Sequence, residues 1–193
     1  MDLSPQVLLS AYAQGAFPMT DRDGITRWYT ADPRGVVPFE SFHIPGTLRQ
    51  LLRKNPPVFE VRFNSDFEGV MRGCMTQRQD TWISDDLIRA YVRLHHLGFA
   101  HSVETWKDGQ LVGGLYGVTL GAAFFGESMF HRVTDASKVA LVHLVARLQE
   151  RGFELLDSQA TTEHLRKFGC IDIPADDYMK RLDRALSKTR SFV

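Results

Sequence analysis

A polar pair at the end of an apolar stretch is the first feature of this sequence that could organise chemistry. Asp157 directly follows the run from Phe153 to Leu156, and Gln159 lies two residues further on. If the run forms a strand, these two side chains emerge on the same face and share one site. A carboxylate can accept a proton or a positive charge, and an amide can both donate and accept hydrogen bonds. The alternative is that the pair only caps the following turn.

Glu127 is a carboxylate in an aromatic stretch, the segment from Phe124 to Phe130. Burying a carboxylate among aromatic rings is costly unless the charge is paired. We therefore expect Glu127 either to line a substrate pocket or to form a structural ion pair with Arg132 or Lys138. Unless a bulge at Gly126 shifts the register, strand alternation places three residues on the same face as Glu127, namely Phe125, Met129 and His131.

A basic cluster offers a local surface for nucleic acid. Arg49 and Arg53 are four residues apart and share one face of a predicted helix, with Lys54 beside them. Lys plus Arg and Asp plus Glu both number 23, so the chain has no overall basic excess and any such contact must be local. A solvated helix face is the alternative interpretation.

The cysteines and histidines do not form a recognisable metal or redox motif. Cys74 and Cys170 are far apart and outside any C-x-x-C arrangement, which predicts reduced, mostly buried thiols. The seven histidines show no H-E-x-x-H or comparable spacing, so we expect no metal. The sequence has neither a run of about 20 apolar residues nor a signal-peptide pattern, and we expect a soluble cytoplasmic protein without a membrane partner.

The hydrophobic pattern predicts the elements that position these residues. Helical spacing favours helices over residues 5–14, 44–55, 84–98, 136–152 and 162–168, with a last helix opened by Pro174. Alternation predicts a strand over 58–63, and glycine-punctuated β-branched and aromatic residues over 101–130 predict an antiparallel meander before the buried strand at 153–157. We expect an α+β fold, a mixed sheet covered by helices, with a small N-terminal lobe over residues 1–43 and a main domain over 44–193.

Several short segments, in one order along nearly the whole chain, resemble the leucyl/phenylalanyl-tRNA-protein transferases. They are Asp32-Pro33-Arg34, Thr81-Trp82-Ile83, Ala90-Tyr91, Arg93-Leu94-His95, Leu97 to Glu104, Leu111 to Gly117, Gly126 to Phe130, Ala136-Ser137-Lys138 and Asp157-Ser158-Gln159. Any one of these segments would be weak support, but their shared order makes chance a poor explanation.

The resemblance implies a GNAT-like fold that uses the ester of an aminoacyl-tRNA. Leucine or phenylalanine, and in some members methionine, is delivered to proteins that begin with Lys or Arg, which marks them for degradation by the N-end rule. Coenzyme A is not expected, because its pyrophosphate needs a turn of the R/Q-x-x-G-x-G/A type where this sequence has Arg132-Val133-Thr134-Asp135-Ala136-Ser137. We expect aminoacyl-tRNA and acceptor proteins as partners, no cofactor, and a monomer.

The resemblance also implies roles for particular residues. Asp157 is expected to accept a proton or positive charge from the amine, with Gln159 as a hydrogen-bond relay, and Glu127 is expected in the substrate pocket. The apolar part of that pocket is Leu115, Phe124, Met129, Leu141, Leu144 and Leu156, which periodicity alone would assign to the core. The tRNA would be bound by Trp82, Tyr91 and Tyr12 at its terminal nucleotides and by Arg49, Arg53 and Lys54 at its acceptor stem.

Two features depart from the family pattern. Met19 stands where many relatives have a tryptophan after the Phe-Pro pair, and Tyr12 and Trp28 are the residues that could compensate. Longer relatives also carry further residues before the position of Asp2, so the N-terminal lobe is expected to be abridged. Two other functions stay open: a related transferase that uses another aminoacyl-tRNA, such as arginyl-tRNA, and a non-catalytic adaptor that binds protein N-termini or tRNA.

Overall fold

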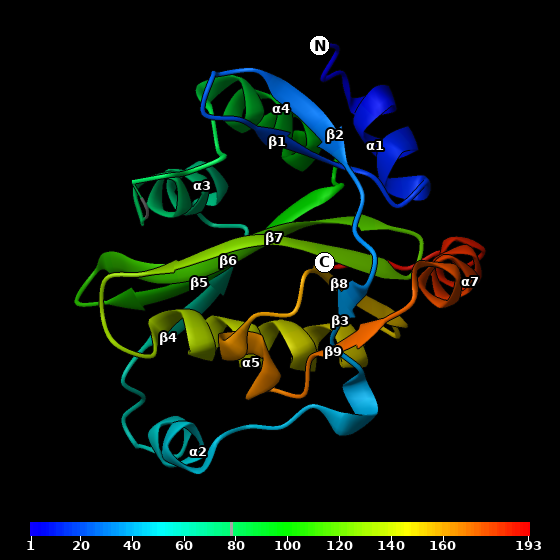
Figure 1. Cartoon of the computed structure of the whole chain (residues 1–193). Helices are drawn as coiled ribbons and strands as arrows, with labels where there is room; N and C mark the ends of the chain where they lie inside the picture. The colour runs from blue at the N-terminus through cyan, green and yellow to red at the C-terminus, as the bar shows by residue number, and fades with distance from the viewer. Residues whose placement is uncertain (78) are drawn as a thin grey trace.

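The computed structural model describes residues 1–77 and 79–193, and within them seven strands form one mixed sheet (Figure 1). The strand order is β4-β5-β6-β7-β8-β3-β9. The strands are β3 (Arg34–Val36), β4 (Glu60–Phe63), β5 (Ala100–Lys107), β6 (Gln110–Leu120), β7 (Ala123–His131), β8 (Leu155–Gln159) and β9 (Ile171–Ile173). Neighbouring strands run antiparallel except β7 and β8, which are parallel and are joined through helix α5 (Ala136–Glu150).

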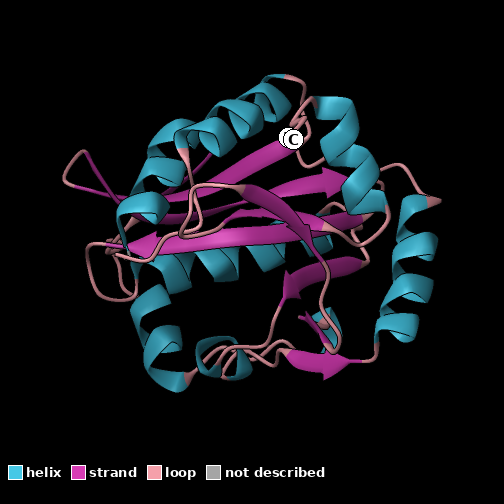
Figure 2. Ribbon diagram, turned by 45° about the horizontal axis from the view of Figure 1, so that its top comes forward, coloured by secondary structure: helices cyan, strands magenta, loops and turns pink. Residues whose placement is uncertain are grey.

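Helices cover both faces of this sheet (Figures 1 and 2). One face carries α1 (Pro5–Ala13), α3 (Phe67–Gln77), α4 (Asp85–His96) and α7 (Ala175–Leu186), and the other carries α5 and α2 (Gly46–Leu52). The short helices η1 (Phe39–Ser41) and α6 (Glu163–Arg166) lie in connections. The expected α+β fold, a mixed sheet covered by helices, is therefore confirmed.

Two hydrophobic cores follow from strand alternation, one on each face. The α4-side core contains Tyr12, Tyr91, Tyr116, Phe125 and Phe130, and the α5-side core contains Leu115, Phe124, Leu141, Leu144, Leu156 and Phe192. Adjacent residues such as Leu115 and Tyr116 point to opposite cores because successive side chains alternate across a strand. These cores place aromatic hydroxyls on one face and aliphatic side chains on the other.

A β-bulge at Glu127 interrupts this alternation in β7. Tyr116 of β6 pairs with Ser128 and the next residue, Gly117, pairs with Gly126, so Glu127 is the extra residue. Phe125 consequently faces the α4-side core, whereas Met129 packs against the α5-side core. The placement of Phe125 and Met129 on one face, which was expected only without a bulge near Gly126, is therefore wrong, because the bulge reverses the strand's face at this point.

Several element boundaries differ from the sequence prediction. The basic helix covers only Gly46–Leu52, and the strand predicted from residue 58 begins at Glu60. The turn-rich stretch before β3 forms a separate hairpin, β1 (Phe17–Thr20) and β2 (Thr26–Tyr29). Such short strands carry too little periodicity to be predicted from one sequence.

The N-terminal segment packs into the main body of the fold. Leu8 and Tyr12 of α1 belong to the α4-side core, and β3 pairs with both β8 and β9. The division into a lobe over 1–43 and a domain over 44–193 stays a prediction. Among the helices of the described residues, none is long and apolar enough to cross a membrane.

Candidate functional site

Asp157 lies in the middle of β8 as a fully buried carboxylate paired with Arg34 of β3. Arg34 Nε donates to Asp157 Oδ1 at 3.0 Å and Arg34 Nη2 donates to Oδ2 at 2.6 Å, a bidentate ion pair. Arg34 is 1% exposed, its Nη1 donates to the carbonyl of Gly15 at 2.8 Å, and its guanidinium lies over the ring of Tyr178. Burial lowers the pKa of Arg34, but the hydrogen bonds to Asp157 and the negative charge of Asp157 act together against it, and the net pKa is raised.

Two further donors complete the environment of Asp157. The hydroxyl of Tyr178 donates to Oδ2 at 2.8 Å and the backbone N–H of Gln159 donates to Oδ1 at 2.8 Å. Each carboxylate oxygen therefore accepts two hydrogen bonds. Burial, followed by the charge of Asp157, raises the pKa of Tyr178 well above its ordinary value, so the phenol stays a donor. This arrangement fixes the position of the Asp157 carboxylate.

Sequence reasoning missed Arg34 and Tyr178. Arg34 belongs to the Asp32-Pro33-Arg34 segment, and an arginine in an apolar surrounding needs a carboxylate partner, but its partner lies 123 residues away in sequence. Tyr178 belongs to the last helix, whose apolar stripe predicts burial but not a hydrogen-bond partner. Long-range pairing is the part that a single sequence cannot supply.

Gln159 offers a polar group that is not used within the fold. Its backbone adopts φ 58°, and its side-chain Nε2 is buried without a hydrogen-bond partner among the residues that the structure describes. A buried amide N–H without a partner is destabilising, and such groups recur at functional sites. The opposing residue on β3 is Gly35, where an added Cβ would lie 2.5 Å from the backbone of Ala160.

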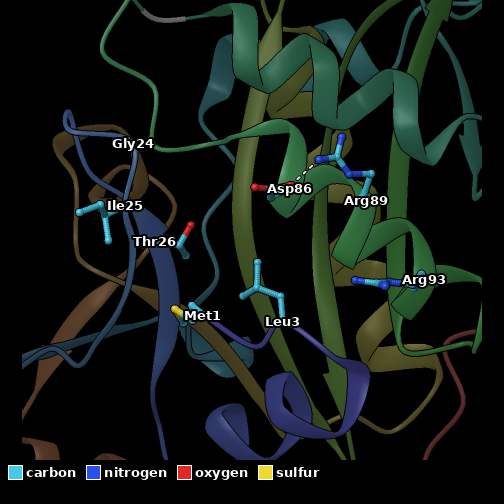
Figure 3. Close-up of a pocket in the computed structure, with 8 residues that line it drawn as sticks. All are labelled: Met1, Leu3, Gly24, Ile25, Thr26, Asp86, Arg89 and Arg93. Carbon is cyan, nitrogen blue, oxygen red and sulfur yellow. Dashed lines mark hydrogen bonds and ion pairs between the residues drawn. The ribbon is translucent and has the colours of Figure 1, made fainter.

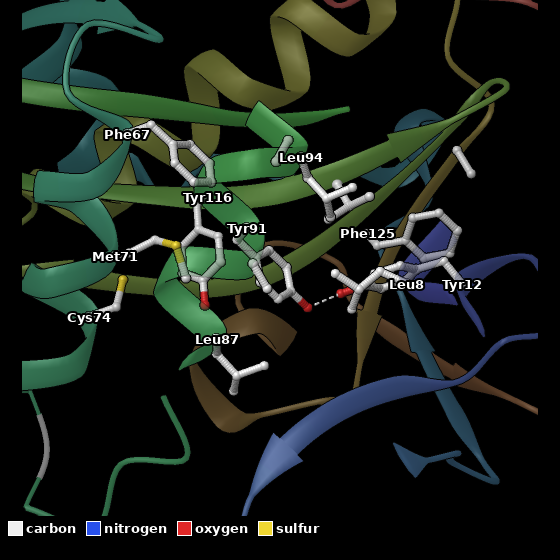
Figure 4. Close-up of a cluster of buried hydrophobic side chains, with 14 of the residues drawn as sticks. Leu8, Tyr12, Phe67, Met71, Cys74, Leu87, Tyr91, Leu94, Tyr116 and Phe125 are labelled. Atoms are coloured by element: carbon white, nitrogen blue, oxygen red, sulfur yellow. Dashed lines mark hydrogen bonds between the residues drawn. The ribbon is translucent and has the colours of Figure 1, made fainter. Parts of the chain in front are cut away.

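Glu127 is partly buried and hydrogen-bonded by a pair of tyrosines rather than by a cation. Tyr12 Oη donates to Glu127 Oε1 at 2.6 Å, and the hydroxyls of Tyr12 and Tyr91 hydrogen-bond to each other (Figure 4). Burial raises the pKa of Glu127 to about 8, and the negative charge of Asp157 adds to the rise, whereas the Tyr12 hydrogen bond opposes it. Glu127 therefore titrates near neutral pH.

The structural ion pair considered for Glu127 is not the arrangement found. Lys138 donates to Asp135 at 2.6 Å, and the guanidinium of Arg132 lies 5.8 Å from the ring of Phe130. The bond to Tyr12 takes the place of the expected cation. Asp135 itself occupies the N-cap position of α5, although its side chain makes no capping bond among the described residues.

Strand geometry relates the two carboxylates. β7 and β8 pair in parallel over Ala123–Phe125 and Leu155–Asp157, and this pairing ends just before Glu127 and Gln159. β8 then continues beside β3, where Gln159 pairs with Gly35, while β7 continues beside β6. Glu127 and Gln159 thus lie on the two strands just past their last shared pair, a place we call the strand separation.

The predicted apolar pocket residues lie together on the other face of the sheet. Leu115, Phe124, Leu141, Leu144 and Leu156 are all at most 4% exposed and belong to the α5-side core, and Met129 is partly buried against it. Phe124 and Leu156 pair with each other one position before the last shared pair of β7 and β8, so this part of the cluster adjoins the strand separation. Plain core packing remains the alternative interpretation of these residues.

The residues predicted to bind tRNA are not all brought together. Tyr12 and Tyr91 are fully buried, with hydroxyls at Glu127, whereas Trp82 is only partly buried and its carbonyl accepts from Thr20. The side chains of Arg49, Arg53 and Lys54 are exposed on and just after α2, on the opposite face of the sheet (Figure 1). Met19 and Trp28, both partly buried, lie on the β1–β2 hairpin.

An open hollow of about 520 Å³ lies between the β1–β2 hairpin and α4 (Figure 3). It is lined by Met1, Leu3, Gly24, Ile25, Thr26, Asp86, Arg89 and Arg93. None of these residues belongs to the predicted site, and Arg89 is paired with Asp86. This hollow is therefore separate from the strand separation and from the apolar cluster.

Other reactive side chains add little to the site. Cys74 and Cys170 are both buried, as the sequence predicted, and Cys170 Sγ lies 3.3 Å from Ser158 Oγ. Among the described residues, no group of three or more His, Cys, Asp or Glu side chains could hold a metal ion.

Comparison with known proteins gives a consistent family match. The model described as "Leucyl/phenylalanyl-tRNA protein transferase" matches residues 36–183, and the corresponding N-terminal domain model matches residues 1–32. Relatives named leucyl/phenylalanyl-tRNA–protein transferase include one from Paramagnetospirillum magneticum, 53% identical over 98% of this chain and 92% of the relative. Another, from Rubrobacter xylanophilus, is 49% identical over the full length of both chains.

Solved structures of similar fold include two N-acetyltransferases. The PaiA N-acetyltransferase of Thermoplasma acidophilum, solved with coenzyme A, has a TM-score of 0.35 and 11% identity over 49% of this chain and 75% of that chain. A ribosomal-protein-alanine N-acetyltransferase from Brucella melitensis has a TM-score of 0.40 and 17% identity over 56% of this chain and 86% of that chain. This likeness concerns the fold alone.

Proposed function

Because the chain belongs to the leucyl/phenylalanyl-tRNA protein transferase family, we propose that the strand separation is where its reaction takes place. The reaction is aminoacyl transfer from aminoacyl-tRNA to the N-terminus of a protein. In chemical terms, an α-amino group attacks the ester carbonyl, a C–N bond forms, and the C–O bond to the terminal ribose breaks. The nitrogen must lose a proton, and the ribose oxygen must gain one.

Glu127 is the group that we assign to this proton. An α-amino group has a pKa of about 7.7 to 8.0, so a useful fraction is neutral near neutral pH. Glu127, with its pKa raised to about 8, matches that range, takes the proton when ionised, and can return it to the departing ribose oxygen. The Tyr12–Tyr91 pair fixes the orientation of the carboxylate during both steps.

Asp157 serves as an orienting charge in this proposal. The observation that carries the proposal is the contrast between its four hydrogen bonds, two of them from Arg34, and the tyrosine contact of Glu127. Protonating Asp157 would break up its ion pair. Asp157 instead holds the turn that places Gln159, whose unpaired amide can donate to the oxyanion that forms at the ester carbonyl.

The donor side chain is assigned to the α5-side cluster. Leu115, Phe124, Met129, Leu141, Leu144 and Leu156 offer an aliphatic and aromatic lining without a buried charge, which suits leucine or phenylalanine and not arginine. One methylene in such a pocket is worth about 1 to 3 kcal/mol, so a graded preference that extends to methionine is expected.

The tRNA and acceptor assignments complete the proposal. Trp82, with Arg49, Arg53 and Lys54, is assigned to the tRNA, by stacking for the tryptophan and by phosphate contacts for the basic group. The acceptors are assigned as proteins that begin with Lys or Arg, as the family resemblance implies. We place the enzyme in the cytoplasm, as a monomer, and in the pathway that marks such proteins for degradation.

A transfer assay tests this function directly. The purified protein is mixed with tRNA carrying labelled leucine or phenylalanine and with a peptide that begins with Arg or with Ala. Label should move to the Arg peptide alone. Binding of tRNA and peptide without transfer would indicate an adaptor, and transfer of arginine from arginyl-tRNA would indicate a related transferase.

A further inference from the structure

Phe192 is a buried ring in the α5-side core, beside Phe124 of the residues assigned to the donor pocket. It is 2% exposed, and its ring centroid lies 5.7 Å from that of Phe124. We infer that Phe192 fixes the depth of the donor pocket by holding the Phe124 ring in place, so that it helps to set which amino acid is transferred. This inference rests on the function proposed above.

Phe124 is confined between Phe192 and the backbone of β6. A Cβ built on Gly117 would lie 2.4 Å from the Phe124 ring, so that ring rests on a stretch of β6 where glycine leaves room for it. Phe124 is itself fully buried and shares its core with Leu115, Leu144 and Leu156. Because the backbone at Gly117 blocks movement of the Phe124 ring on one side, the size of Phe192 limits how far that ring can move away from the pocket.

Phe192 is in turn backed by a fixed ring. His101 stacks on it with centroids 4.4 Å apart, and the His101 ring is hydrogen-bonded at Nε2 to the carbonyl of Gly98 and at Nδ1 to Asn64. Burial lowers the pKa of His101 to about 4, so the stack is uncharged at neutral pH. Phe63 meets the edge of Phe192 at 6.0 Å. The layer from His101 through Phe192 to Phe124 is therefore rigid on its far side.

Changing the size of residue 192 should change the donor preference in opposite directions. Phe192→Ala gives the Phe124 ring room to move away from the pocket, which favours the larger donor, phenylalanine, over leucine. Phe192→Trp adds volume behind Phe124 and should favour leucine over phenylalanine. Because pocket shape discriminates apolar side chains by about tenfold or more per methylene, a change of about tenfold in the ratio is expected.

The test measures a ratio within each protein. Full-length wild type, Phe192→Ala and Phe192→Trp are each supplied with an equal mixture of leucyl-tRNA and phenylalanyl-tRNA and with a peptide that begins with Arg. Mass spectrometry of the extended peptide gives the phenylalanine-to-leucine product ratio. The ratio should rise for Phe192→Ala and fall for Phe192→Trp. A loss of folded protein lowers both products equally and leaves the ratio unchanged.

A matched control distinguishes failure of the Phe192 inference from failure of the proposed transferase function. Phe168→Ala removes an equally buried ring of the same core that stacks on Phe42 instead of Phe124, and it should keep the wild-type ratio. A wild-type ratio in both Phe192 variants, with transfer intact, overturns the role of Phe192 and leaves the proposed function standing. Absence of any leucine or phenylalanine transfer by wild type overturns both.

Discussion

The surroundings of Asp157 and of Glu127 differ, although the two carboxylates lie on neighbouring strands near the same separation. Asp157 is enclosed by Arg34, Tyr178 and a backbone N–H, whereas Glu127 meets the hydroxyl of Tyr12. A carboxylate held by a buried cation keeps its charge, and one held by neutral donors can change its charge near neutral pH. In the proposed function, Asp157 therefore has a structural role in the site, whereas Glu127 takes part in the reaction. Variants of Arg34 and Asp157 test the first role, and variants of Glu127 test the second.

The largest expected effect is on stability, on the Asp157 side. Arg34→Met leaves a fully buried carboxylate without its cation, which should lower the free energy of unfolding by about 3 to 5 kcal/mol in urea denaturation. Asp157→Ala should be as damaging, because it strands the buried Arg34. Arg62→Met is the control, since its partner Glu60 is exposed, and it should change stability little. An unchanged free energy of unfolding in Arg34→Met would contradict the structural role of the Arg34–Asp157 ion pair.

On the Glu127 side, the main effect should fall on the rate of transfer. Glu127→Gln keeps the shape and the acceptor oxygen for Tyr12 but removes the titrating group. Single-turnover transfer to an Arg peptide should fall by about 10² to 10⁴, the usual contribution of general acid–base catalysis. The urea midpoint at about pH 5 should stay near that of wild type, because folded Glu127 is then protonated and uncharged like the amide. A near-normal rate in this variant would contradict the assignment of the proton to Glu127.

The sequence predicted the site residues themselves but not the residues that they contact. Asp157, Gln159 and Glu127 stood out by local pattern, as did the α5 helix and the meander that carry them. The partners did not, because Arg34 and Tyr178 meet Asp157 only through long-range packing. A bulge near Gly126 was considered from the sequence, but its occurrence at Glu127 could not be decided there, since it depends on how β7 registers with β6 and not on the composition of β7.

Gln159 should give the next largest effect on rate. Gln159→Ala removes the unpaired amide donor, and loss of one oxyanion donor costs about 10² to 10³ in rate. Ser158→Ala, the neighbouring change, is the control and should keep most activity in the same single-turnover assay. Equal rates for Gln159→Ala and wild type would mean that the amide does not meet the oxyanion.

A further prediction concerns the pH dependence of stability. The folded-state pKa of Glu127 is raised from 4.5 to about 8, so its contribution is fully present below about pH 4.5 and is lost as the pH rises through about 8. Relative to Glu127→Gln, wild type should therefore lose stability between pH 5 and pH 8.5, measured as urea midpoints of both proteins. A constant difference between the two proteins would show that Glu127 does not titrate in this range.

The most direct test of the account is the pH dependence of single-turnover transfer in wild type and Glu127→Gln, with the same Arg peptide. Below about pH 8, wild type must lose a proton from both the acceptor amine and Glu127, so the logarithm of the rate should rise with a slope near two. In Glu127→Gln the amine alone titrates, and the slope should be near one. The same slope in both proteins would contradict the claim that Glu127 carries the proton.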